Sequence, residues 1–152
     1  MKKQKTEYAN KSKVEKKWLS INAAGKTVGR LASEVAKQLM GKNNVLYTPS
    51  VVTGEFVILY NAEKVIVTGN KADQKVYFRH SRFPGGLKET SYKEMLQNYP
   101  ERILMYAIKG MLPKNKLGKK MLTRLRVFKG ENHNLEAQTP LEHEFSSLKE
   151  SK

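Results

Sequence analysis

A continuous apolar run at residues 55–60 (EFVILY) most constrains what this sequence can fold into. Its β-branched members favour a strand, and its lack of polar alternation is typical of a strand covered on both faces. Strands of this kind occur mainly in parallel sheets, whose crossover connections carry helices over the faces. The sequence around the run must therefore supply further strands and the helices that cover them.

The preceding segments show this alternation of strand and helix. Residues 18–22 (WLSIN) alternate apolar and polar side chains and predict a strand, and Ala24-Gly25 predicts a turn. Residues 27–40 carry apolar side chains at helical spacing, and Gly41 ends the predicted helix. Strands that alternate with helices predict an α/β fold with parallel strand pairs and helices on both faces of the sheet.

Shorter elements are predicted in the second half of the chain. Ser91, followed three residues later by Glu94, has the spacing of a helix capping box, and Pro100 and Pro113 interrupt helices. The residues after Gly130 show little periodicity and predict a surface tail. The predicted strands are 64–68, 75–79 and 126–128, and the predicted helices are 91–98, 101–111 and 116–125.

The charge of the chain indicates a polyanionic partner. Lys and Arg number 29 against 14 Asp and Glu, which gives a net charge of +15 and a pI near 9.9. RNA or DNA is favoured over an anionic membrane, because a dense polyanion neutralises such a surface best. The basic start of the sequence has no apolar run after it, and no run of about 18 apolar residues occurs, so we expect neither a secretory signal nor a membrane span. The chain has no Cys, which excludes disulfides, and the expected compartment is the cytoplasm.

The charge is unevenly distributed along the chain. Residues 1–17 hold seven Lys and two Glu, residues 101–130 hold nine basic residues and one Glu, and residues 131–152 hold two Lys and five Glu. This pattern predicts a basic N-terminal arm over 1–17, an RNA-binding α/β domain over 18–130 and a C-terminal tail over 131–152. The arm is either extended until it binds its partner or a plain solvated tail.

A nucleotide-triphosphate loop has little support. Gly25-Lys26-Thr27 resembles the end of such a loop, but the glycine required five residues earlier is Ser20, inside the predicted strand. A helix N-terminus beside Lys26 and Arg30 still suits one backbone phosphate, with a simple strand-to-helix turn as an equal alternative.

Catalytic and metal-binding patterns are not found in the sequence. His80, His133 and His143 are far apart and lack metal-ligand spacing. No GxSxG motif and no pair of carboxylates suited to acid–base catalysis stands out. We therefore expect no catalytic residue, no metal site and no cofactor.

Two segments have the composition of RNA-contacting surfaces. Residues 77–88 combine aromatic rings, guanidinium groups and glycines, which RNA recognition uses for bases, phosphates and close backbone approach. Residues 109–120 predict a basic turn between two helices that presents ammonium and N–H groups to a curved phosphate path. The alternatives are aromatic residues that pack on the sheet and a solvated run of charge.

Six segments in order carry a resemblance to a known family: AGKTVGRLAS (24–33), GK…YTP (41–49), TGEFVILYNAEKVIVTGNK (53–71), YFRHSRFPGGLK (77–88), PERILMYAIKGMLPKNKLGKKM (100–121) and FKGENHNLEAQTP (128–140). From Trp18 to about Leu141, the chain resembles the bacterial large ribosomal subunit protein thirteen family. It departs from the family after Pro49, where Ser50-Val51-Val52 replaces the usual His-Val-Asp.

The resemblance implies a three-layer α/β/α domain with a four-stranded, mostly parallel sheet. It also implies binding to large-subunit (23S-type) ribosomal RNA, support of early subunit assembly and translation, and no catalytic site. The expected partners are this RNA, neighbouring large-subunit proteins and, as a further candidate, the chain's own mRNA. The expected location is the ribosome, with an organellar ribosome left open.

The basic segments and the resemblance together give a set of expected RNA contacts. They are Lys26, Arg30, Lys42, Arg79, His80, Arg82, Lys88, Lys109, Lys114, Asn115, Lys116, Lys119, Lys120, Arg124 and Arg126. Two other functions stay open: a regulatory RNA- or DNA-binding protein acting away from the ribosome, and a nucleotide-dependent enzyme.

Overall fold

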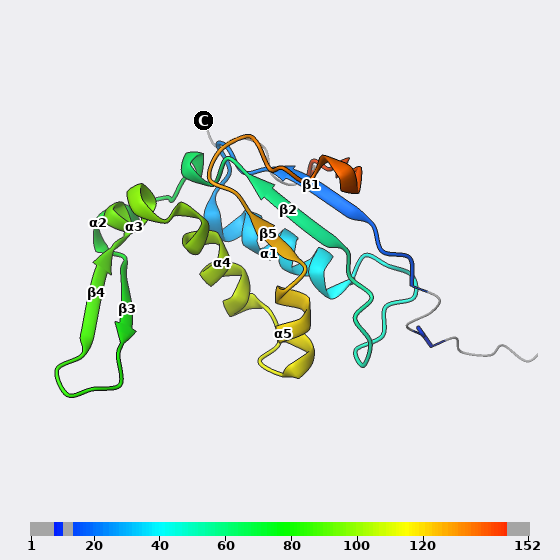
Figure 1. The fold of residues 1–152 in the computed structure, drawn as a ribbon, viewed down its shortest axis with the longest axis horizontal. Coiled ribbons are helices and arrows are strands. Elements are labelled where there is room, and N and C mark those ends of the chain that lie inside the picture. The colour runs from blue at the N-terminus through cyan, green and yellow to red at the C-terminus, as the bar shows by residue number, and fades with distance from the viewer. Residues whose placement is uncertain (1–7, 11–13, 146–152) are drawn as a thin grey trace, which may run out of the picture.

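The computed structural model describes residues 8–10 and 14–145. Residues 1–7 and 11–13 of the expected arm, and 146–152 of the expected tail, lie outside this range. The described part contains a four-stranded sheet in the order β5-β2-β1-β6, all of whose pairs are parallel (Figure 1). Its strands are β1 (Trp18–Asn22), β2 (Phe56–Tyr60), β5 (Leu125–Val127) and β6 (Leu141–Glu142).

Strand β2 is the buried centre of this sheet, as its apolar sequence predicts. Val57, Ile58 and Leu59 are all fully buried. The register pairs Val57 with Leu19 of β1 on one side and with Leu125 of β5 on the other. Both edges of β2 are therefore used, and both of its faces are covered.

The main helices lie together on one face of the sheet. They are α1 (Val28–Met40), α4 (Pro100–Met111) and α5 (Lys116–Leu122). The steps from β1 to β2 and from β2 to β5 run in the same direction across the sheet, so right-handed crossovers place their helices on the same face. The core between sheet and helices includes Ile21, Leu31, Val35, Leu39, Val57, Leu59, Ile103, Leu104 and Ile108.

The return connection from β5 to β6 covers the other face. It carries the 3₁₀ helix η2 (Glu136–Gln138), and the ring of His133 lies 6.3 Å from that of Tyr60 on β2. Figure 1 shows α1, α4 and α5 on one side of the strands and the η2 segment on the other. The arrangement is consistent with the expected three-layer α/β/α fold.

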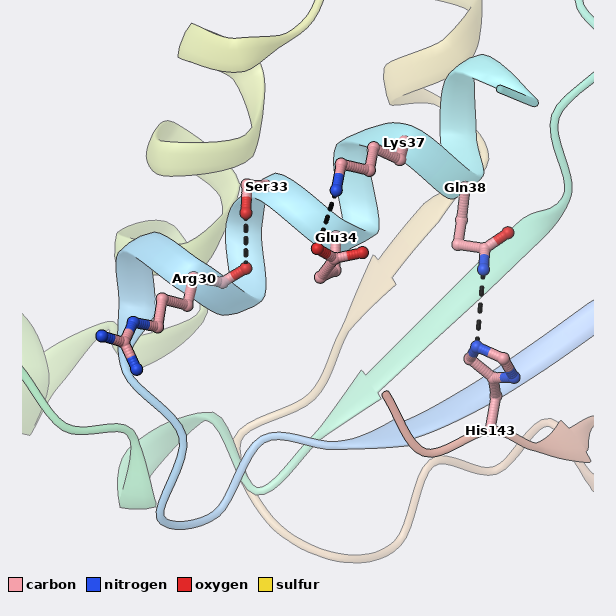
Figure 2. Close-up of polar contacts among 6 residues, drawn as sticks. All are labelled: Arg30, Ser33, Glu34, Lys37, Gln38 and His143. Carbon is pink, nitrogen blue, oxygen red and sulfur yellow. Dashed lines mark hydrogen bonds and ion pairs between the residues drawn. The ribbon is translucent and has the colours of Figure 1, made fainter. Parts of the chain in front are cut away.

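The predicted surface tail after Gly130 is wrong for residues 141–145. Strand β6 pairs with the free edge of β1, and the N–H of His143 donates to the carbonyl of Ser20 at 2.9 Å. Figure 2 shows the ring of His143 reaching toward helix α1, where its Nε2 lies 3.4 Å from Nε2 of the buried Gln38. Phe145 is buried in the core, so this segment completes the fold.

Two other predicted elements differ from the structure. Residues 64–68 form no sheet strand; within them only Ile66 pairs, through a single bridge to Thr27. The helix predicted over 116–125 ends at Leu122, because Leu125 enters strand β5. The segment before 64–68 forms the 3₁₀ helix η1 (Ala62–Lys64).

A separate hairpin extends from one end of the body (Figure 1). Strands β3 (Val76–His80) and β4 (Leu87–Ser91) pair antiparallel, between α2 (Lys71–Gln74) and α3 (Tyr92–Asn98). Strand β3 was predicted and β4 was not. The predicted cap of α3 is confirmed, because the Ser91 hydroxyl accepts the N–H of Glu94 at 3.2 Å.

Gly54, at the entry to β2, leaves no room for a side chain. A Cβ there would overlap the carbonyl of Leu39 at the end of α1, whereas a Cβ on Gly29, exposed in α1, would meet nothing within 4 Å. We expect Gly54→Ala to lower the free energy of unfolding by about 1–3 kcal/mol. The control Gly29→Ala should leave it unchanged or raise it by up to about 1 kcal/mol. Equal urea midpoints for the two variants would contradict this packing.

Candidate nucleic-acid interface

The turn between α4 and α5 is closed by specific local contacts. Helix α4 ends at Met111, the buried Leu112 follows it in an extended conformation, and Pro113 cannot continue the helix. The Asn115 side-chain oxygen then caps α5 by accepting the N–H of Gly118 at 2.7 Å. A Cβ on Gly118 would overlap the carbonyl of Pro113, so only glycine fits there. The predicted structured turn between two helices is confirmed.

Five exposed lysines surround this turn. They are Lys109, Lys114, Lys116, Lys119 and Lys120, and we call them together the basic turn. Three of them, with Asn115, line a cavity of about 200 Å³. The ion pairs within the described residues are Lys17–Glu15, Lys37–Glu34 and Lys93–Asp73, so these ammonium groups carry no carboxylate partner there. Their charge is available to an anion.

The expected contacts of the hairpin gather at its strands and tip. Arg79, Arg82 and Lys88 are exposed, and Arg79 stands directly opposite Lys88 across the two strands. His80 shapes the tip, because its Nδ1 accepts the N–H of Arg82 at 2.9 Å while Arg82 adopts a left-handed backbone with φ 71°. These groups lie apart from the basic turn along α4 (Figure 1).

The strand-to-helix turn before α1 lacks the free N–H groups of a nucleotide-triphosphate loop. The N–H groups of Gly25, Lys26 and Val28 already donate to carbonyls of the chain at 3.0–3.2 Å. This geometry removes the basis for a nucleotide-triphosphate loop. Lys26 is half-buried, whereas Arg30 is exposed and Figure 2 shows its guanidinium directed away from the other labelled side chains of α1.

Arg30 lines a larger hollow together with two basic residues that were not among the expected RNA contacts. This cavity of about 660 Å³ also includes Lys71 and Lys75 of the α2 region. Neither lysine stands in a run of positive charge, so only the fold brings them next to Arg30.

The remaining expected contacts are scattered. Lys42 and Arg126 are exposed, after α1 and on β5 respectively. Arg124 is half-buried, because its guanidinium donates to the carbonyl of Gly54 and lies 5.2 Å from the ring centroid of Phe56. Burial lowers the pKa of Arg124 from its ordinary value. This side chain holds β5 against the entry to β2.

Acidic side chains gather on the opposite face of the sheet. Burial first, and then the carboxylates of Glu142, Glu131 and Glu144, raise the pKa of Tyr60 above its ordinary value. Tyr60 follows the inward-facing Leu59 on β2 and so points away from α1 and α4. Arg126 shares this face with the carboxylates, because its register partner Ile58 alternates with Leu59 and points the same way as Tyr60.

Neither a three-ligand metal cluster nor a membrane-spanning helix occurs in the described part of the chain. No three His, Asp or Glu side chains there come together as a group able to hold a metal ion. No helix among residues 8–10 and 14–145 has the length and apolar character needed to cross a bilayer.

Comparisons with known proteins point to one family. The sequence model of a family described as "Ribosomal protein L13" matches residues 16–134. A protein of Desulfitobacterium hafniense named large ribosomal subunit protein uL13 is 56% identical over 135 residues, covering 89% of this chain and 94% of the relative. Proteins of the same name from Agathobacter rectalis and Chloroflexus aggregans are 52% and 50% identical over 93% and 90% of this chain, and over 99% and 95% of their own lengths.

The capping role of Asn115 can be separated from a contact to RNA. Asn115→Ala should lower the free energy of unfolding by about 1 kcal/mol, because the N–H of Gly118 loses its acceptor. Asn115→Asp keeps the acceptor and should retain stability, while its added negative charge weakens RNA binding. Thermal unfolding and RNA titration of both variants check this. Equal stability of the Ala and Asp variants would contradict the capping role.

Proposed function

The chain belongs to the ribosomal protein L13 family, and on that premise we propose that it binds large-subunit ribosomal RNA directly and supports early subunit assembly and translation. As a family member it is a structural, non-enzymatic constituent of the large ribosomal subunit and is located on the ribosome. Ribosomal RNA and neighbouring ribosomal proteins are its partners in that setting.

The basic turn is the observation that carries the proposal. Its five ammonium groups are exposed and have no carboxylate partner among the described residues. Its backbone is fixed by the Asn115 cap and by the close approach of Gly118 to Pro113. A rigid surface loses little conformational entropy on binding, and each phosphate it neutralises releases counterions. Such a turn suits a folded RNA backbone that must be held in one shape.

A role early in subunit assembly follows from this arrangement. A basic surface that is already folded can bind RNA before other proteins arrive, since its fixed turn depends on contacts within the chain. Lysines on a rigid turn hold neighbouring phosphates together and oppose their mutual repulsion. The protein would thereby stabilise a local RNA fold on which later components assemble.

Sedimentation of growing-cell extracts tests the proposal as a whole. The full chain should sediment with large subunits and their precursors, and it should be released as salt increases, because the contact is electrostatic. A chain found only outside ribosomal particles would contradict the proposal. In a binding competition, a short transcript of the chain's own mRNA serves as competitor. If the chain binds this transcript more tightly than it binds large-subunit RNA, a regulatory function is favoured instead.

A triple substitution distinguishes the basic turn from diffuse charge. Replacing Lys114, Lys116 and Lys119 by Ala should weaken binding to large-subunit RNA. It should also reduce the dependence of log K on log salt by about one for each lost phosphate contact. The matched control replaces Lys2, Lys3 and Lys5, which removes the same charge from the arm. Equal losses in both variants would show that the shape of the turn is unimportant.

A further inference from the structure

A hollow lies between the hairpin and the helices at its base. Its volume is about 350 Å³, and its lining comes from β3, β4, α3 and α4. This size is at the lower end of the range for small-molecule sites in proteins, so it suits a group no larger than a nucleoside. The principal side chains are Tyr77, Arg79, Lys88, Tyr99, Arg102 and Tyr106.

Aromatic rings form one wall of this hollow. The centroids of Tyr77 and Tyr106 are 5.9 Å apart, with 37° between the ring planes. The guanidinium carbon of Arg102 lies 4.1 Å from the ring centroid of Tyr99. Tyr99 and Tyr106 are 50% and 46% exposed, so both retain accessible ring surface. Rings and guanidinium planes are the groups on which proteins stack unpaired bases.

The positive charge of the hollow favours an anionic ligand. Arg79 and Lys88 occupy directly opposite positions in the antiparallel pair, where like charges destabilise a sheet. A two-stranded hairpin is already marginal in stability, so this repulsion is costly unless a bound anion offsets it. Arg102 adds a third positive charge to the lining, against the single carboxylate of Glu94.

The polar groups of the lining suit the edge of a base. The Glu94 carboxylate can accept a hydrogen bond from an exocyclic amino group, and the Asn98 amide can both donate and accept. Burial, and to a smaller extent Tyr92 and Tyr106, raises the pKa of Tyr77 to about 12. The Tyr77 hydroxyl is neutral at physiological pH, as an ordinary tyrosine also is, and can donate a hydrogen bond.

We propose that this hollow receives one unstacked base of the large-subunit RNA, stacked on Tyr99 and Tyr106, with an adjoining phosphate between Arg79 and Lys88. The inference rests on the proposed function, which supplies the RNA. It assigns a role to Tyr99, Arg102 and Tyr106, which the basic segments of the sequence did not indicate. A protein segment could use the same rings, but the opposed Arg79 and Lys88 favour a phosphate-bearing ligand.

Affinity measurements on the full chain test the stacking. With large-subunit RNA as the probe, the double substitution Tyr99→Leu, Tyr106→Leu should weaken binding about tenfold or more, because base stacking is lost. It should leave the salt dependence unchanged, since no phosphate contact is removed. The variant Tyr99→Phe, Tyr106→Phe keeps both rings and should bind like the wild type. Thermal unfolding establishes that each variant is folded.

Two further variants test whether the effect is specific to rings in the hollow and whether Arg79 contacts a phosphate. Tyr47→Leu removes a ring that is 40% exposed outside the hollow and should have no effect on affinity. Arg79→Ala should lower both affinity and the salt dependence, the latter by about one. Equal affinity of folded Leu, Phe and wild-type proteins would overturn the proposal.

Photo-crosslinking identifies the occupant directly. A benzophenone side chain at position 106, in the full chain assembled into large subunits, should crosslink to an unpaired RNA nucleotide. A crosslink to a paired nucleotide or to a protein, or no crosslink, would overturn the base-binding site. If the proposed function itself were wrong, the chain would not sediment with large subunits at all. The crosslinking outcomes above can therefore be distinguished from failure of the proposed function.

Discussion

The burial of β2 on both faces and along both edges is the constraint on which the rest of the structure depends. Because Val57, Ile58 and Leu59 are fully buried, the strand must have a neighbour on each side and a layer over each face. Both neighbours are parallel, so each requires a crossover that returns the chain to the same end of the sheet. The crossover from β1 needs only α1. The crossover to β5 is much longer, and it contains the basic turn and the hollow at the hairpin, the two surfaces that we propose for RNA recognition.

The crossover from β2 to β5 sets the positions of two different surfaces. Helix α4 packs its apolar side on α1 and the sheet, and so fixes both of its own ends. The hairpin and its hollow lie near its first turn, and the basic turn follows its last. One buried helix thereby sets the relation between a surface suited to phosphates and a hollow suited to a base. Core packing and RNA recognition are linked through this helix.

Much of the fold could be predicted from sequence because its main signals are local. Strands β1 and β2, helix α1 and helix α4 follow from apolar periodicity and their end signals. Strand β6 could not be predicted, because its two residues are ordered by the free edge of β1 and not by their own sequence. The strand-like residues 64–68 were mispredicted because their apolar alternation reflects the packing of Val65 and Val67 on the core and not pairing in the sheet. Helical spacing does place Tyr99, Arg102 and Tyr106 on one side of α4, but their meeting with Tyr77 is tertiary. The proposed RNA contacts remain predictions.

The uneven distribution of charge over the molecule has a consequence for how it approaches a partner. Carboxylates surround Tyr60 on the face away from α4, while the basic turn and the hairpin belong to the crossover on the other. Such an uneven distribution of charge gives the molecule an electric dipole moment in addition to its net charge. In the field of a polyanion it experiences a torque that rotates the basic side forward before contact. Orientation would thus be set during diffusion, and added salt would slow encounter as well as weaken the complex.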